Sequence, residues 1–238
     1  MHDYNVIAAG DTALIVDFGN RVDLEINAKV LALASRLNEL KIGGIIETVP
    51  TIRSLSVYYE PLSISAGQLE RQIADILQHL NEAHVEGRTY DIPICYDPEL
   101  APDLELVARQ CRLSPARVIE RHAGRTYHVY MLGFLPGLAY LGDLPPELAL
   151  PRRATPRPRI PAGSLGIGGK LTCIYPMATP CGWHVIGRSP TSLWSAEPND
   201  SVLLRAGDKV KFEPISLHQY QRMCPQVSIA TPQTGVKH

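Results

Sequence analysis

Several features that are common in proteins are missing from this sequence of 238 residues. No apolar run approaches the roughly 18 residues that span a bilayer, and the first residues lack the basic and apolar regions of a secretory signal. The five cysteines form no Cys-x-x-Cys pair, and their odd number does not suit a disulfide framework. A net charge of −1 lacks the basic excess of nucleic-acid-binding domains. We therefore expect a cytoplasmic globular protein with no membrane partner, no nucleic-acid partner and no metal site.

Acidic residues are absent from one long stretch of the chain. The 49 residues between Glu147 and Glu197 contain no Asp or Glu but include six basic residues. Residues 1–92, in contrast, have a net charge of −6. Because solvated faces usually mix both signs, the acid-free stretch favours an anionic small-molecule ligand or partner. The alternative is that its arginines pair with the acidic first region.

Proline is scarce before residue 93 and frequent after it, which divides the chain into two parts. Only two of the 20 prolines precede residue 93, whereas fifteen lie between Pro93 and Pro198. In residues 1–92, strand-like and helical patterns predict a small α+β domain with helices on one face of an antiparallel sheet. The predicted strands cover residues 4–8, 13–18, 45–49, 55–59 and 90–95, and the predicted helices cover residues 26–40 and 64–80.

Residues 93–238 are predicted to form a mainly β domain, as a barrel or sandwich of short strands. A long loop is expected at residues 133–169, and loops of that length are usually functional. Short helices are expected at residues 102–111, 114–122 and 216–223, and strands at residues 126–132, 171–175, 184–186, 202–204 and 209–212. The tail after Pro225 is expected to be poorly ordered.

A glycine-rich segment, residues 163–169, lies within the second part. It fails the Walker A pattern at Ser164 and Leu171, and Leu171 also breaks the dinucleotide-binding pattern. Backbone amides of such a segment can still hold an anion. The candidate anion cradle consists of Gly163, Gly166, Gly168 and Gly169. Ser164 matches a nucleophile elbow only loosely, so a hydrogen-bonding role is expected for its hydroxyl.

One histidine and three aromatic residues have two interpretations each. His122 ends a predicted helix, where it is either a general acid or base or a structural histidine. Tyr140, Tyr175 and Trp183 lie near glycines in the second part and either line a pocket or fill the barrel.

Longer stretches of the second part are more specific than these short motifs. Residues 127–142 read YHVYMLGFLPGLAYLG, residues 155–169 read TPRPRIPAGSLGIGG, and residues 182–190 read GWHVIGRSP. They resemble the signature of the allophanate hydrolase subunit 1 and KipI family, and the resemblance extends over essentially the whole chain. It implies an α+β N-terminal domain followed by a mainly β, cyclophilin-like barrel domain.

The resemblance also implies a function. Members of the family act with partner subunits in the ATP-dependent opening of 5-oxoproline to glutamate. The chain would then bind partners resembling 5-oxoprolinase subunits C and A, and it would act on its small-molecule substrate only within that complex. ATP would be used through the complex, with no metal or biotin held by this chain. Two alternatives stay open: a KipI-like inhibitor that binds a histidine kinase dimerisation domain, and a carboxyltransferase-type subunit of urea or allophanate metabolism.

For the enzyme interpretation, roles can be assigned to individual residues. Ring opening through a phosphorylated, anionic intermediate would use Arg153 and His122 as catalytic residues, with Arg152 and Arg157 as electrostatic clamps. Further substrate contacts are expected from Tyr130, Tyr140, Ser164, Thr172, Tyr175 and Trp183. The sequence departs from the family pattern at three positions, because Leu171 replaces a Gln and each of Cys173 and Cys181 replaces a Gly.

Overall fold

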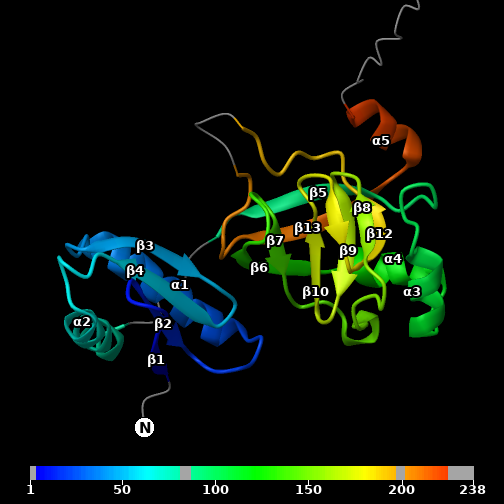
Figure 1. Cartoon of the computed structure of the whole chain (residues 1–238). Helices are drawn as coiled ribbons and strands as arrows, with labels where there is room; N and C mark the ends of the chain where they lie inside the picture. Colours follow the sequence, from blue (N-terminus) through cyan, green and yellow to red (C-terminus); the bar gives the residue numbers. More distant parts are fainter. Residues whose placement is uncertain (1–3, 81–86, 197–201, 225–238) are drawn as a thin grey trace, which may run out of the picture.

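The computed structural model describes residues 4–80, 87–196 and 202–224, and their secondary-structure elements form two groups (Figure 1). The first group, drawn in blue and cyan, is a four-stranded antiparallel sheet in the order β1-β2-β4-β3 with two helices. Its elements are β1 (Asn5–Ala8), β2 (Ala13–Asp17), α1 (Leu24–Leu40), β3 (Ile45–Pro50), β4 (Ser54–Tyr59) and α2 (Ala66–Gln78). Each element overlaps the range that the sequence predicts for it.

The two helices of this group begin at capping residues and pack through apolar faces. The Asp23 carboxylate accepts hydrogen bonds from the first backbone amides of α1, and Ser65 forms a reciprocal capping box with Gln68 at the start of α2. Apolar residues at helical spacing then face the sheet. The resulting core includes Leu14, Val16, Leu33, Leu37, Leu55, Val57, Leu69 and Ile73.

The second group is a closed seven-stranded barrel in the order β10-β7-β6-β13-β5-β12-β9, in which β9 pairs with β10 to complete the circle. Its strands are β5 (Thr89–Cys95), β6 (Thr126–Leu132), β7 (Ala139–Leu141), β9 (Ser164–Gly168), β10 (Leu171–Ile174), β12 (His184–Arg188) and β13 (Lys209–Ile215). The other elements are α3 (Leu104–Cys111), α4 (Pro115–Ala123), η1 (Pro146–Leu148), β8 (Arg157–Ile160), β11 (Thr179–Cys181) and α5 (Leu217–Met223). Strands β8 and β11 form a separate two-stranded sheet. Among the described residues, no helix is both long and apolar enough to cross a bilayer.

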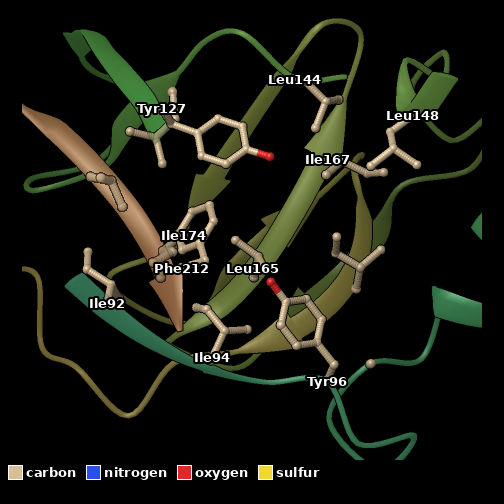
Figure 2. Close-up of a cluster of buried hydrophobic side chains, with 14 of the residues drawn as sticks. Ile92, Ile94, Tyr96, Tyr127, Leu144, Leu148, Leu165, Ile167, Ile174 and Phe212 are labelled. Carbon is tan, nitrogen blue, oxygen red and sulfur yellow. The ribbon is translucent and has the colours of Figure 1, made fainter. Parts of the chain in front are cut away.

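Side chains fill the interior of the barrel (Figure 2). Aliphatic residues such as Ile94, Leu165 and Ile167 are completely buried there. Tyr96 and Tyr127 extend into the same core, and their hydroxyl groups are directed inward. The barrel is therefore a packed core and not an open channel.

The structure corrects three of the expectations drawn from the sequence. Residues 133–169 contain β7, η1, β8 and β9 and are not one long loop. Strand β5 begins before the expected boundary at residue 92, and it pairs with β12 and β13 of the barrel and not with the first sheet. Residues 202–204 contribute only an isolated bridge between Val202 and Trp194. The expected tail after Pro225 lies outside the described residues.

Asn27 of α1 connects the first group of elements to the barrel. It is fully buried, and its Nδ2 lies 3.1 Å from the carbonyl oxygens of Thr51, Ile52 and, on β6, Tyr130. Its Oδ1 lies 2.9 Å from Nε2 of His128. Because an amide oxygen can only accept, His128 must be the donor in this bond. The amide of Asn27 is thus fully satisfied by groups from both parts of the chain.

We predict that Asn27→Leu lowers the free energy of unfolding by about 2 to 4 kcal/mol. The substitution leaves the buried carbonyls and the His128 donor without their partner, and each unsatisfied group costs about 1 to 3 kcal/mol. Urea unfolding of the full chain measures the change. Asn38→Ala, on the exposed face of the same helix, is the control and should change stability by less than about 0.5 kcal/mol. Equal stability of Asn27→Leu and the wild type would contradict the assigned role.

Candidate functional site

Two of the expected site arginines, Arg153 and Arg157, pair with one buried carboxylate. Nη1 of Arg153 donates to Oδ1 of Asp103 at 2.8 Å, and Arg157 donates to both Asp103 oxygens at 2.6 and 2.7 Å. The amide of Val185 also donates to Oδ2 at 2.7 Å. The hydrogen bonds that Arg157 donates to Asp103 raise the pKa of this arginine. Asp103 therefore receives donors from β12, from β8 and from the segment before β8.

The position of Asp103 shows which acidic residue pairs with these two arginines. The sequence offers the acidic residues 1–92 as alternative partners. The carboxylate instead belongs to Asp103, which precedes α3 in the second part of the chain. A single Asp before a helix resembles an ordinary cap, and it lies 50 residues from Arg153, so no local signal identifies it. Two positive charges share one negative charge here, and the group as a whole remains cationic.

A second set of expected residues gathers outside the barrel core, under the sheet formed by β8 and β11. The buried Tyr175 and Trp183 belong to one apolar cluster, and the half-buried Tyr140 packs against it. The rings of Tyr140 and Trp183 are 6.0 Å apart in an edge-to-face arrangement. The guanidinium carbon of Arg152 lies 5.8 Å from the Trp183 ring centroid. Arg152 is exposed and forms no ion pair within the described residues, so its charge is available at the surface beside this cluster.

The three departures from the family pattern lie in the same cluster. Cys173 and Cys181 are buried, on β10 and β11 respectively, and Leu171 is half-buried against them. The Cys181 thiol donates to the Tyr175 hydroxyl at 3.2 Å. Burial raises the pKa of the Cys173 thiol and that of the Tyr175 hydroxyl. These side chains are neutral and fill space between the aromatic rings.

The glycine-rich segment that is expected to cradle an anion contains the buried strand β9, and the amides at both ends of the segment already donate within the chain. The amide of Gly163 donates to the Tyr175 carbonyl at 2.7 Å, and that of Gly169 donates to the Leu150 carbonyl at 2.7 Å. Between them, Gly166 pairs with β10 and β12, and Gly168 pairs with β10. Both glycines also lie against the Trp183 side chain. A Cβ atom on Gly168 would lie 2.8 Å from the Trp183 ring, so this glycine makes room for a side chain and not for an anion.

His122 and Thr172 meet inside the barrel. Nδ1 of His122 lies 3.0 Å from the Tyr96 hydroxyl, and Nε2 lies 3.1 Å from Oγ1 of Thr172. Because the Thr172 hydroxyl donates its hydrogen to the Gly166 carbonyl, Nε2 of His122 is the donor and Nδ1 accepts from Tyr96. Complete burial lowers the pKa of His122 to about 3. A neutral, fully hydrogen-bonded ring has the geometry of a structural histidine, and its role as a proton donor stays a prediction.

The two remaining expected residues lie apart from these groups. The Ser164 hydroxyl donates to the Pro161 carbonyl at 2.7 Å, a local turn contact. Tyr130 lies at the junction with α1, where its carbonyl accepts from Asn27 and its hydroxyl is 3.5 Å from the Asp143 carboxylate. Burial raises the pKa of this hydroxyl.

Two buried polar atoms next to Arg152 have no partner among the described residues: Nε of Arg153 and Nδ1 of His184. His184 Nε2 lies 3.0 Å from the Pro151 carbonyl, which can only accept, so Nε2 is the donor and Nδ1 is the acceptor of the neutral ring. The Arg153 amide donates to the Gly182 carbonyl at 2.8 Å, so residues 151–153 run along residues 182–184. Both atoms are buried, so neither is exposed at the surface that carries Arg152. We call Arg152, Arg153, His184 and Trp183 the arginine–tryptophan site.

The described residues contain no group of three or more His, Cys, Asp or Glu side chains arranged to hold a metal ion. At the surface, the arginine–tryptophan site instead offers the charge of the exposed Arg152, while the Trp183 ring and the two unpartnered atoms are buried beside it. The exposed guanidinium group suits the binding of a small anion.

Residues 4–204 match the family model described as carboxyltransferase domain, subdomain C and D, and the chain belongs to this family. Within it, the chain is similar to proteins named as the B subunit of 5-oxoprolinase. It is 41% identical to the protein of Bacillus subtilis over 91% of this chain and 95% of that protein. The corresponding protein of Escherichia coli O157:H7 is 38% identical over 86% of this chain and 93% of that protein.

Solved structures agree with the fold. The structure of TTHA0988 aligns with a TM-score of 0.77 at 35% identity, over 86% of this chain and 40% of that longer chain. PH0987 from Pyrococcus horikoshii is 39% identical and aligns with a TM-score of 0.55 over 91% of this chain and 100% of that chain. The Kluyveromyces lactis urea carboxylase shares the fold alone, with a TM-score of 0.76 at 20% identity over 92% of this chain and 22% of that chain.

The buried carboxylate of Asp103 gives a first prediction for this region. Asp103→Asn should lower the free energy of unfolding by about 3 to 5 kcal/mol, because it leaves two partly buried arginines without a counter-charge. Urea unfolding measures the loss. Glu105→Gln, an exposed carboxylate in the first turn of the same helix, is the matched control and should behave as the wild type. A small loss for Asp103→Asn, close to that of the control, would show that the arginines do not depend on this carboxylate.

The burial of His122 predicts a pH dependence of stability. Its pKa is about 3 in the folded state, against about 6.5 for an unfolded chain. Below pH of about 6.5 only the unfolded chain takes up the proton, so the stability from this group is lost as the pH falls, by about 1.4 kcal/mol per pH unit. The variant His122→Gln should lack this contribution, and its stability difference from the wild type should shrink between about pH 6.5 and pH 4.

Urea unfolding at a series of pH values tests this prediction. His79→Gln, at the exposed end of α2, is the control and should keep the slope of the wild type. Parallel curves for His122→Gln and the wild type across the whole range would contradict the burial of a neutral His122.

Proposed function

We propose that this chain is a subunit of an ATP-dependent 5-oxoprolinase that opens 5-oxoproline to glutamate together with partner subunits. The observation that carries the proposal is the identity of 41%, 38% and 35% to three proteins named as the B subunit of 5-oxoprolinase, each covered over more than nine-tenths of its length. Matches at this identity that cover most of both chains support the same subunit role and not only the same fold.

The chemistry of the arginine–tryptophan site is compatible with this function. Activation of a lactam by ATP forms a phosphorylated, anionic species, which a cationic surface stabilises. Arg152 supplies an exposed positive charge that forms no ion pair with the described residues, and its stacking over the Trp183 ring positions that charge. In this proposal the residues bind and orient the substrate, and ATP is held through the complex.

Because these relatives are each named as one subunit of an enzyme, we infer partners that resemble subunits A and C of the same enzyme. The longer chain of TTHA0988, of which this chain aligns with 40%, supports a unit that is joined to further protein. We also infer two domains, because residues 4–80 and residues 87–224 contain separate apolar cores. The boundary then falls before Thr89, because β5 belongs to the barrel. A cytoplasmic location and a cyclophilin-like barrel are part of the same proposal.

Reconstitution tests the function. The chain is co-expressed with candidate subunits A and C from the same genome, and glutamate release from 5-oxoproline is measured with and without ATP. Glutamate should form only when all three proteins and ATP are present. If the complete mixture releases no glutamate while each protein is folded, or if the mixture without this chain is equally active, the proposed function is wrong.

Arg152→Ala tests the site within that complex. We expect glutamate release at low substrate concentration to fall about tenfold or more, because one charge-assisted contact is worth about 1.5 to 3 kcal/mol. The thermal transition should stay within a few degrees of the wild type, since Arg152 is exposed and its guanidinium group lies over the Trp183 ring. Arg159→Ala, an exposed arginine on β8, is the matched control. Unchanged activity of Arg152→Ala would exclude Arg152 from the site.

A further inference from the structure

A cavity of about 570 Å³ lies at the end of the barrel where β5 and β13 begin. Figure 1 shows this end of the barrel on the side of the four-stranded sheet. The lining includes Arg88, Tyr90, Ser192, Trp194, Arg205 and Asp208. None of these residues belongs to the arginine–tryptophan site, and the volume is within the range of small-molecule sites, roughly 300 to 1,000 Å³.

Asp208 holds the backbones of two arginines together at this cavity. Its Oδ1 accepts from the amide of Arg88 at 2.8 Å, and its Oδ2 accepts from the amide of Arg205 at 2.7 Å. Both oxygens of the carboxylate are therefore used by backbone groups, and Asp208 itself is buried. In this way one side chain fixes the backbones of two residues that are distant in the sequence.

The side chains of Arg88 and Arg205 keep unpaired positive charge. Both are exposed, and neither forms an ion pair with any residue of the described ranges. Asp208 is the one acidic residue in the described lining, so two positive charges face one negative charge. An anion that binds in a cavity lined by two like charges reduces the repulsion between them. Guanidinium groups bind phosphate or carboxylate through paired hydrogen bonds.

The same cavity has an aromatic part that is held in place. Trp194 bridges to Val202, and its carbonyl accepts from the Ser192 hydroxyl at 2.8 Å. Gly137, with φ of 77°, packs so closely that a Cβ atom there would lie 2.8 Å from Cβ of Trp194. Trp194 and Tyr90 thus add flat apolar surface beside the two arginines.

We propose that this cavity binds a small molecule in which an oxyanion, phosphate or carboxylate, is joined to a flat ring. Arg88 and Arg205 hold the anion, and Trp194 and Tyr90 contact the ring. The proposal does not depend on the 5-oxoprolinase function, and it is tested on this chain alone.

Calorimetric titration of the full chain with four probes tests the proposal. AMP combines phosphate with a ring, nicotinate combines carboxylate with a ring, adenosine has the ring without the anion, and inorganic phosphate has the anion alone. We expect AMP or nicotinate to bind at least about fivefold more tightly than both adenosine and inorganic phosphate, because only these two probes make both the charge contacts and the ring contacts. A preference between AMP and nicotinate identifies the oxyanion.

Variants connect the binding to the cavity. Arg88→Gln and Arg205→Gln should each weaken the bound probe about tenfold or more, while Trp194→Leu should remove the advantage over inorganic phosphate. Arg109→Gln, an exposed arginine of α3 outside the lining, is the matched control. Thermal transitions of all variants check folding, and loss of binding counts only for variants that melt as the wild type does.

Three results would overturn the proposal. The first is that neither AMP nor nicotinate binds below about 10 mM, which corresponds to only about 3 kcal/mol. The second is that adenosine binds as tightly as AMP, or that inorganic phosphate binds as tightly as both AMP and nicotinate. The third is that correctly folded Arg88→Gln and Arg205→Gln bind like the wild type.

Discussion

The carboxylate of Asp103 is the interaction on which the surface of the barrel depends. It joins the start of α3, the backbone of β12 and the arginines around β8, three parts of the chain that no strand pairing connects directly. Burying one charge is unfavourable unless it is fully hydrogen-bonded, and here four donors satisfy both oxygens. Because Asp103 holds Arg153 in place, the backbone of the neighbouring Arg152 is also held where its exposed side chain lies over the buried Trp183 ring.

The first group of elements could be predicted from sequence because its signals are local. Asp23 and Ser65 mark helix starts, and the apolar spacing that follows them is regular. Strand β9 shows why the strands of the barrel are harder to predict from the sequence. In this strand Leu165 and Ile167 point into the barrel core, while Gly166 and Gly168 lie under the rings of the outer cluster. Inward and outward positions do alternate along this strand. The outward positions are glycines, however, and a residue without a side chain gives no polar or apolar signal for the face on which it lies.

The site was predicted only in part, and the reason is the distance between its residues along the chain. The acid-free stretch correctly indicated a concentration of arginines, and the expected residues Tyr140, Tyr175 and Trp183 do come together. Charge counts over a stretch cannot show that Asp103, which lies outside it, pairs with two of those arginines. The contacts of Asp208 with the backbones of Arg88 and Arg205 likewise give no signal in the sequence. The two arginines are distant along the chain, and their segments meet through the parallel pairing of β5 with β13.

The contact made by Asn27 affects how the two parts of this protein can change during evolution. Three of its four partners are backbone carbonyls, which every amino acid possesses, so the side chains at positions 51, 52 and 130 can vary without loss of these bonds. Only Asn27 and His128 must keep their chemical identity for the connection to persist. At this contact one asparagine and one histidine are therefore the pair that has to be inherited together, while the residues that supply only a carbonyl are free to diverge.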